Sequence, residues 1–262
     1  MSVEIINRIA VNSGCYATNV QQKAKPSSAQ NSHYRKFYST NQPFLVLHSL
    51  GCQRDSADIQ ADKWDTPNGQ SIAHACVDAR DGKTRQTLPW DFRGWHIGTD
   101  GNDIAIGVEM AESLSIKYKG GDKFDVLDAD KARKNCRIAY EGAVELFAYL
   151  CGAFGVDPLG KREINGKLFP EVMSHNEYNR IRGASGHTDP EHYWTGLGMP
   201  YTMDGFRRDV KAKLNGGNSD SDIIYRIQIG AFRNHAYAEA YLARVQKDYP
   251  NAFIVTAEKP RG

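Results

Sequence analysis

Two histidines and an aspartate, His175, His187 and Asp189, lie within fifteen residues of the chain, in a stretch rich in glycine, serine and asparagine. Imidazole nitrogen and carboxylate oxygen are ligands of Zn²⁺ in sites that keep one position open for water. His48, at the end of the apolar run 44–47, offers a further ligand from a distant part of the sequence. The alternative is two unrelated loop histidines beside a strand histidine, because no compact zinc motif is present. Spacing alone leaves both interpretations open.

The composition is typical of a soluble protein with one main domain. The 262 residues can bury a sizeable core, and the formal net charge of +2 is too small to argue for a nucleic-acid partner. No apolar run reaches the length of about eighteen residues that a membrane span needs, so we expect no membrane insertion. Nothing at the N-terminus is typical of a secretion signal, which predicts a protein made and kept in the cytoplasm. The five cysteines lack Cys-x-x-Cys spacing, so we expect them to be reduced.

Apolar runs with the periodicity of strands predict a sheet. We expect strands at 44–50, 71–79, 84–88, 104–110 and 172–174. Asp81-Gly82 predicts a hairpin turn between the second and third of these strands. The last strand ends immediately before His175 and would deliver it to the sheet. Residues 1–43 are weakly patterned and predict no particular element.

Three segments have the pattern of helices. Ser56 is expected to cap a short helix. Asp128 is expected to cap a long helix in which apolar residues recur every three or four positions, and which ends at Gly155. Thr202 is expected to cap a last helix at 203–214. Strands near the start and one long covering helix predict an α/β domain with a mixed β-sheet covered by helices.

The chain is expected to divide into three parts. Residues 1–215 would form the main domain, with 1–43 as an N-terminal extension. Residues 216–222 are a flexible linker by composition. Residues 223–262 would form a small β-α-β module with a helix at 234–247. Because this module is small for an independent core, we expect it to dock, to mediate oligomerisation or to be an incomplete unit.

Several motifs occur in an order that resembles one known family. They are Leu45-Val46-Leu47-His48, Ser71-Ile72-Ala73-His74, Gly94-Trp95-His96-Ile97-Gly98, Asn102 through Glu109, and Ser174-His175 through Asp189-Pro190. Over residues 44–215 the chain resembles the zinc-dependent N-acetylmuramoyl-L-alanine amidases of type 2, whose fold is shared with peptidoglycan recognition proteins. The resemblance is closest to bacteriophage endolysins. The run from Tyr225 to Phe232 resembles the opening of a SPOR repeat, a peptidoglycan-binding module.

This resemblance implies a zinc site of His48, His175 and Asp189, with Glu109 in the place of the catalytic glutamate. In the family a lysine often stands two residues before the metal carboxylate, and this sequence has His187 there. His187 then either replaces the lysine as a donor to the oxyanion or is itself a zinc ligand. We favour the donor, because three ligands already leave one position for water.

Three more residues are candidate substrate contacts. Trp95 and His96 lie in a loop rich in aromatic residues, and His74 shares a strand face with Ile72. For each of them, packing in the interior is the alternative. Three neighbours of the implied ligands are expected to be structural: Glu177, Glu191 and His192.

The implied activity is hydrolysis of the amide bond between the lactyl group of N-acetylmuramic acid and L-alanine in bacterial peptidoglycan. The protein would act as a phage endolysin on the cell wall after release from the cell. One alternative is a peptidoglycan-binding protein of the same fold without catalysis. Another is a cytoplasmic amidase that recycles muropeptides. The presence of all three implied ligands favours an enzyme.

Overall fold

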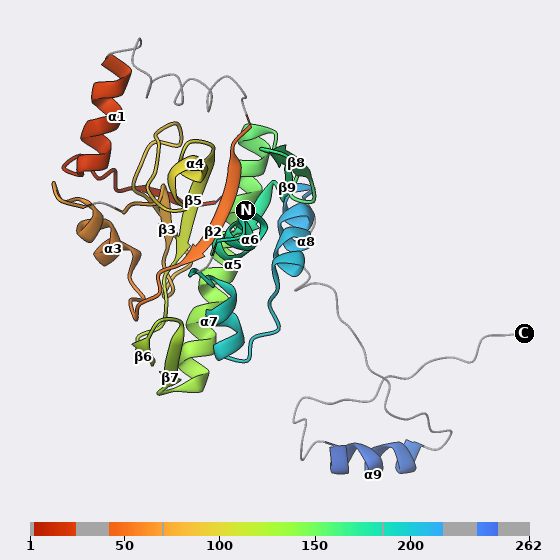
Figure 1. Cartoon of the computed structure of the whole chain (residues 1–262). Helices are drawn as coiled ribbons and strands as arrows, with labels where there is room; N and C mark the ends of the chain where they lie inside the picture. The colour runs from red at the N-terminus through yellow and green to blue at the C-terminus, as the bar shows by residue number, and fades with distance from the viewer. Residues whose placement is uncertain (1–2, 25–41, 70, 185, 217–234, 246–262) are drawn as a thin grey trace, which may run out of the picture. The chain divides into compact units, whose positions relative to one another are not determined.

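A six-stranded sheet with the strand order β1-β4-β3-β5-β2-β10 forms the centre of the protein (Figure 1). The computed structural model describes residues 3–24, 42–69, 71–184, 186–216 and 235–245. The chain divides into two compact units, Met1–Asp220 and Ser221–Gly262, and the sheet belongs to the first. Its strands are β1 (Ile5–Asn7), β2 (Phe44–Ser49), β3 (Ala75–Val77), β4 (Thr84–Gln86), β5 (Ala105–Met110) and β10 (Val172–Ser174).

The sheet contains both parallel and antiparallel pairs. β2 runs parallel to β5 and β10, and β3 runs parallel to β5. β4 returns antiparallel to β3 through the predicted turn at Asp81-Gly82, and β1 runs parallel to β4. Gly82 has a φ of 73°, a conformation that costs glycine little. The predicted mixed-sheet α/β fold is confirmed.

One face of the sheet is covered by the long helix α5 (Ala129–Phe154). The side chain of Asp128 accepts a hydrogen bond from the backbone of Lys131, and Gly155 ends the helix in the left-handed conformation. Both ends of this helix are therefore where the sequence predicts them. Helix α8 (Met203–Leu214) packs beside α5 and is capped by Thr202, again as predicted.

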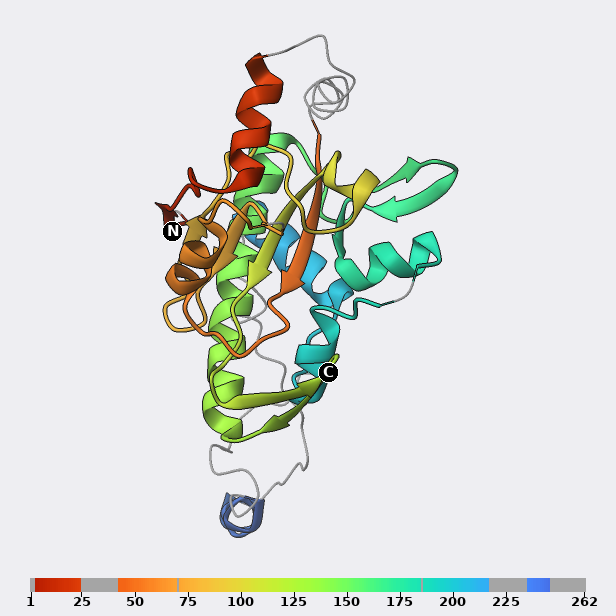
Figure 2. The same cartoon turned by 60° about the vertical axis from the view of Figure 1, so that its left-hand side comes forward.

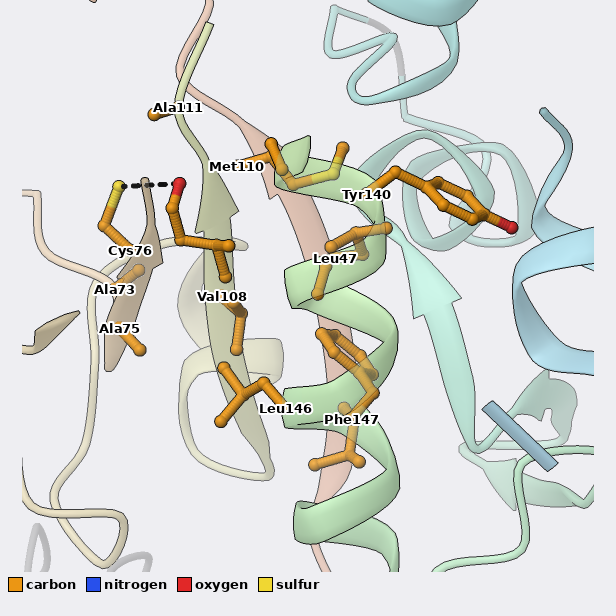
Figure 3. Packing of buried hydrophobic residues seen from close by; sticks show 14 of the residues in the cluster. Leu47, Ala73, Ala75, Cys76, Val108, Met110, Ala111, Tyr140, Leu146 and Phe147 are labelled. Carbon is orange, nitrogen blue, oxygen red and sulfur yellow. Dashed lines mark hydrogen bonds between the residues drawn. The ribbon is translucent and has the colours of Figure 1, made fainter. Parts of the chain in front are cut away.

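The contact between α5 and the sheet is apolar (Figure 3). Leu47 of β2 and Val108 of β5 lie opposite Leu146 and Phe147 of α5, and all four side chains are fully buried. Burying an aliphatic side chain of this size contributes about 1.5–3 kcal/mol relative to leaving it in water. This layer is the main source of the stability that holds the strands in register.

The opposite face of the sheet carries a smaller apolar cluster and then turns polar. Phe44 and Val46 of β2 pack there with Met173 of β10 and with Tyr178 of α6 (His175–Arg182). Figure 2 shows α6 and the hairpin of β8 (Lys161–Ile164) and β9 (Lys167–Pro170) on the side of the strands away from α5. Because side chains alternate along a strand, His48 follows Phe44 and Val46 on this second face.

Several elements differ from the sequence predictions. The predicted strand at 71–79 is regular only over β3, because Ile72 forms an isolated bridge to Trp95 and His74 bonds to a loop. The hairpin of β6 (Ile116–Gly120) and β7 (Lys123–Val126) was not predicted, and neither were three short helices. These are α4 (Thr99–Asn102), α6 and α7 (Glu191–Gly196). The helix predicted after Ser56 is present as α3 (Ala57–Trp64), with Ser56 as its cap.

The N-terminal extension is structured where the model describes it. It contributes the edge strand β1 and the helix α1 (Gly14–Ala24), neither of which the sequence pattern predicts. In the second unit, helix α9 (His235–Val245) confirms the predicted helix at 234–247, and the two predicted strands of that unit lie outside the described residues. All five cysteines are free thiols. None of the helices described is long and apolar enough to cross a membrane.

Candidate metal centre and pocket

His48, His175 and Asp189 meet in one buried cluster. One ligand atom of each lies within 4.8 Å of the other two, and no residue of the three is more than 7% exposed. The Nδ1 atom of His48 is 3.0 Å from Oδ2 of Asp189, and Nδ1 of His175 is 3.4 Å from Oδ1. The structure therefore brings together the three residues that the resemblance assigns to zinc.

The sheet and the first turn of α6 fix the two histidines. β2 pairs with β5 in a register that places His48 beside Glu109. His175 begins α6, whose N-terminus is a capping box between Ser174 and Glu177. Arg207 of α8 holds the same Glu177 through two hydrogen bonds of 2.8 and 3.1 Å. His175 is thus fixed by a helix start that is itself anchored to the neighbouring helix.

Asp189 reaches the cluster from the loop before α7. Its carbonyl accepts a hydrogen bond from the backbone of Asn176, at 3.2 Å. Glu191, two residues after Asp189, accepts a hydrogen bond of 2.7 Å from the hydroxyl of Ser174 and one of 3.2 Å from the side chain of Asn176. These bonds join α7 to the start of α6, so Glu177 and Glu191 have the structural role that the sequence suggests.

Hydrogen bonds and neighbouring charges compete with burial in setting the charge of this cluster. Burial disfavours the carboxylate of Asp189, but the bonds from His175, His187 and His48 hold its pKa well below the usual value. Burial likewise lowers the pKa of His48, yet the nearby Glu109 and Asp189 raise it overall. Burial dominates at His175 and lowers its pKa to about 4. The cluster presents an anionic carboxylate and a neutral imidazole, as a metal site requires.

Glu109 stands next to the cluster with an unused oxygen. Its Oε2 atom is buried and has no hydrogen-bond partner among the described residues. Burial raises the pKa of this carboxyl to about 7, although the charge of His48 acts in the opposite direction. A carboxyl with a pKa near neutrality is suited to accept and release a proton at physiological pH.

His96 stands beside His48 and has both ring nitrogens engaged in hydrogen bonds. Its Nε2 is 3.2 Å from the carbonyl of Ala105, and since a carbonyl only accepts, the proton is on Nε2. Burial keeps the pKa of His96 well below the usual value, so Nδ1 is an acceptor, and it lies 3.0 Å from Nε2 of His48. His48 must therefore donate from Nε2. A Cβ at position 107 would overlap the His96 ring, which explains the glycine there.

This hydrogen-bond chain provides a test of whether a metal fits. With its proton on Nε2, His48 points the lone pair of Nδ1 at Oδ2 of Asp189, only 3.0 Å away. Two acceptors at that distance repel each other unless a cation, either a proton or a metal ion, is bound there. Two imidazole nitrogens and a carboxylate oxygen form a ligand set for zinc with one position left open. The residues present fit a zinc ion.

His74 has no free atom to offer a substrate. It is fully buried, its Nδ1 accepts from the backbone of Gly107 at 3.1 Å, and its Nε2 donates to the carbonyl of Phe92 at 2.6 Å. Burial lowers its pKa to about 4. The prediction that His74 contacts substrate is therefore wrong, because the side chain is fully buried and its ring nitrogens bond to β5 and to the loop that follows β4. His96 also has both ring nitrogens bonded, to His48 and Ala105, but it is only partly buried, so its contact with substrate stays a prediction.

His187 and Trp95 are at the rim of the site. The ring of His187 stacks on that of His175 with centroids 4.0 Å apart, and its Nδ1 is 3.5 Å from Oδ1 of Asp189. Its side chain is 65% exposed, and it is not a member of the metal-binding cluster. The hydrogen bond to Asp189 raises its pKa above the usual value. Trp95 is 47% exposed, with the guanidinium of Arg93 5.3 Å from the centre of its ring.

These residues line one open cavity of about 840 Å³. The metal-binding cluster and Glu109 lie in its wall, together with His96, His187 and Trp95. Part of the rim is the β6–β7 turn, where Asp122 accepts a hydrogen bond from Thr188. The cavity is large enough for a ligand of several sugar or amino-acid units, because drug-sized ligands occupy about 300–1,000 Å³.

One group of functional interest was missed from the sequence. Glu112 is fully buried, and it accepts hydrogen bonds from the backbone of Gly51 at 3.1 Å and from the hydroxyl of Tyr118 at 2.7 Å. That hydroxyl in turn lies 2.8 Å from Nε2 of His192. Burial raises the pKa of Glu112 to about 7. The network links Gly51 and His192, which both line the cavity, and no spacing pattern signals it because these two residues are far apart in the chain.

The fold and the site define an α/β protein with a buried metal-type centre at the wall of an open cavity. A family model described as N-acetylmuramoyl-L-alanine amidase matches residues 39–192. The match covers more than half of the chain, and the chain belongs to this family, as the sequence predicts. A model of the SPOR domain matches residues 221–262, which confirms the resemblance of the tail.

Three solved structures illustrate the similarity. The hydrolase AmiA of Staphylococcus aureus, in complex with its ligand, is 20% identical with a TM-score of 0.48, over 66% of this chain and 74% of that one. The catalytic domain of XlyA is 18% identical with a TM-score of 0.47, over 79% and 98%. A mutant endolysin from Bacillus subtilis is 18% identical with a TM-score of 0.43, over 74% and 99%. A comparison with curated proteins found no match.

Proposed function

We propose that the protein is a zinc-dependent hydrolase of the amide bond between the lactyl group of N-acetylmuramic acid and L-alanine in peptidoglycan. The observation that supports this most directly is the buried cluster of His48, His175 and Asp189 beside the unpartnered oxygen of Glu109. The family to which the chain belongs is consistent with this reaction. We further propose that the protein acts as a phage endolysin.

His48, His175 and Asp189 would hold the metal. When bound there, zinc polarises the scissile carbonyl and lowers the pKa of a water molecule, which supplies a nucleophile near neutral pH. His96 would keep His48 in the tautomer that leaves Nδ1 free to bind, through the bond from His48 Nε2. The tautomer of His48 is thus set before the metal arrives.

Glu109 would act as general base and then as general acid. Its carboxylate accepts the proton of the attacking water and passes it to the nitrogen of L-alanine as the amide bond breaks. The pKa of about 7 means that both forms of the carboxyl are populated near neutral pH. His187, whose pKa is raised by its bond to Asp189, would donate a hydrogen bond to the oxygen on which negative charge develops.

The rim of the cavity would bind the glycan and the stem peptide. Trp95 offers an exposed ring on which a sugar can pack, and it stands close to Arg93. In the tail, the SPOR match supports a wall-binding function for residues 221–262. We propose that residues 1–215 are the catalytic domain, 216–222 the linker and 223–262 the wall-binding module.

Mass analysis of peptidoglycan digested with the purified protein tests the proposal. The expected products are glycan strands that end in free lactyl groups and peptides with free L-alanine amino termini. Release of reducing sugars, or cleavage between amino acids of the stem peptide, would contradict it. A protein that is free of zinc and only sediments with walls would instead be a binding protein of the same fold. Activity on soluble muropeptides but not on walls would favour the recycling enzyme.

The wall-binding module can be tested by ending the chain after Gly217. The contacts of the catalytic residues lie within the first unit, so we expect a folded domain that retains zinc and hydrolyses small muropeptides. Binding to intact walls should weaken, as measured by co-sedimentation against the full chain. Unchanged wall binding would remove the tail from this role.

A further inference from the structure

Helix α1 lies against the loop that supports the metal centre, although it precedes the segment that the amidase family model matches. Asn19 of this helix is only 2% exposed. Its Oδ1 accepts a hydrogen bond of 2.8 Å from the backbone N–H of Arg93, and its Nδ2 donates one of 3.0 Å to the carbonyl of the same residue. The side chain thus pairs with both backbone groups of Arg93, as a neighbouring strand would.

Further contacts of α1 reach the same part of the loop. The thiol of Cys15 donates to the carbonyl of Arg93 at 3.2 Å, and the ring of Tyr16 packs on that of Phe92 with centroids 5.2 Å apart. The second N–H of Asn19 donates to the carbonyl of Cys15 at 2.9 Å. Every polar group of the Asn19 amide is therefore used, and its rotamer is fixed by bonds on two sides.

Three residues after Arg93, the loop that Asn19 holds reaches His96, the neighbour of the proposed metal ligand His48. Phe92, Arg93 and Gly94 are followed by Trp95 and His96, and His96 bonds to Nε2 of His48 at 3.0 Å. There is little space for the loop to shift. A Cβ at Gly94 would lie 2.8 Å from Cδ2 of His96 and 2.9 Å from Cε1 of the buried His74.

We propose that Asn19 is a positioning residue for the metal centre, acting on His48 through the backbone of Arg93 and the ring of His96. The inference rests on the proposed zinc site. It assigns the N-terminal segment a role in the reaction, because α1 keeps His96 where it fixes the tautomer of His48. The loop is held between His74 on its inner side and Asn19 on its outer side.

The test compares zinc affinity in the full chain for four proteins and for the double variant of Asn19→Leu and His96→Ala. Asn19→Leu keeps the size of the side chain and removes its hydrogen bonds. Thr18→Val is the matched control on the same helix, because Thr18 is exposed and its hydroxyl bonds only within α1, to the carbonyl of Gly14 at 2.8 Å. The set is completed by the wild type and His96→Ala.

Zinc should bind about tenfold more weakly to Asn19→Leu than to the wild type, at the lower end of the range for a group that supports a ligand indirectly. His96→Ala should have an equal or larger effect. Thr18→Val should bind as the wild type does. In the double variant, Asn19→Leu should add little to His96→Ala, because both act by one route. The proposal would be overturned if the losses of zinc affinity in Asn19→Leu and His96→Ala multiplied fully in the double variant. Wild-type zinc affinity in Asn19→Leu would overturn it as well.

Hydrogen exchange gives a readout that does not depend on zinc. In Asn19→Leu the amides of Trp95, His96 and Ile97 should exchange faster, while those of β2 and β5 keep their protection. If the wild type binds no zinc, the proposed function fails, and these exchange rates still decide whether Asn19 holds the loop. If Asn19→Leu does not fold, Asn19→Asp serves instead. Asn19→Asp keeps the acceptor for the N–H of Arg93 and loses the donor. Its zinc affinity should therefore be lower than that of the wild type and of Thr18→Val, and higher than that of His96→Ala.

Discussion

The two faces of the central strands differ in chemistry, although alternate residues of the same strands form both faces. Toward α5, β2 presents Leu45 and Leu47, which belong to the main apolar core. On the other face the strand presents Phe44 and Val46 and then His48. One half of the second face is a small core, and the other half is the wall of the cavity.

This difference shows that packing on the apolar face determines where the side chains of the polar face lie. A strand alternates with a period of two, so a shift of one residue would exchange the faces of β2. The packing of Leu47 and Val108 against α5 excludes that shift. The same register then places His48 beside Glu109 without any direct bond between them. Changes on each face should therefore have separable effects, on stability or on chemistry.

The largest effect should come from removing a ligand on the polar face. In His48→Ala, His175→Ala and Asp189→Ala, we expect loss of stoichiometric zinc and of wall lysis, because two remaining ligands do not hold the metal. Metal content and turbidity of cell-wall suspensions measure both. Full zinc occupancy in any one of these variants would exclude that residue from the ligand set.

A smaller effect is expected at the rim, where His187→Ala should retain zinc while kcat falls by about 10²–10³, the usual loss for one donor to an oxyanion. His187→Lys should recover much of the rate and hold it to higher pH, since lysine stays charged where histidine loses its proton. Zinc content and kcat of the two variants show whether His187 is a donor to the oxyanion or a zinc ligand. If His187→Ala loses the metal, His187 is a ligand and the assignment of His175 must be revised.

On the apolar face, Leu47→Ala should lower the free energy of unfolding by about 2–5 kcal/mol while the folded protein keeps its zinc. Leu47 is fully buried under α5. Leu168→Ala on β9 is the matched control, because Leu168 is 58% exposed and should change stability by less than about 0.5 kcal/mol. Denaturant unfolding measures both. Loss of zinc from folded Leu47→Ala would show that the two faces are not separable.

The smallest effect concerns the charge on Glu109. Its pKa rises from 4.5 to about 7 on folding, so the folded state binds its proton more tightly, and stability falls as the pH rises through this interval. A glutamine does not titrate, so Glu109→Gln does not lose stability over this pH interval. In metal-free protein the variant should gain stability over the wild type between pH 5 and pH 8, by on the order of 2–3 kcal/mol. An equal difference at both pH values would contradict the raised pKa.

The elements that carry the metal ligands are predictable because their signals are local. The apolar run before His48, the cap Asp128 and the glycine at 155 each lie within a few residues of what they specify. The strand that precedes His175 is also found where the sequence places it. Periodicity and caps therefore suffice for the sheet centre, for α5 and for the two strands that lead to His48 and His175.

The supporting residues escape prediction because their partners are distant in the chain. Asn19 and Arg93 are 74 residues apart, and His48 and His96 are 48 apart. His74 and His96 resemble substrate contacts in sequence, since a histidine on a strand face or in an aromatic loop has the same pattern whether its nitrogens are free or bonded. Strand β1 has only three residues, too few for a periodic signal.

The strand order has a consequence for how the protein behaves at high concentration. The two six-residue strands, β2 and β5, lie in the interior of the sheet, whereas the edges are β1 and β10, with three residues each. An edge strand offers unpaired N–H and C=O groups to any other extended chain, and its length sets how many. With short edges the sheet gives a neighbouring molecule little to pair with, which limits self-association and aggregation through backbone pairing.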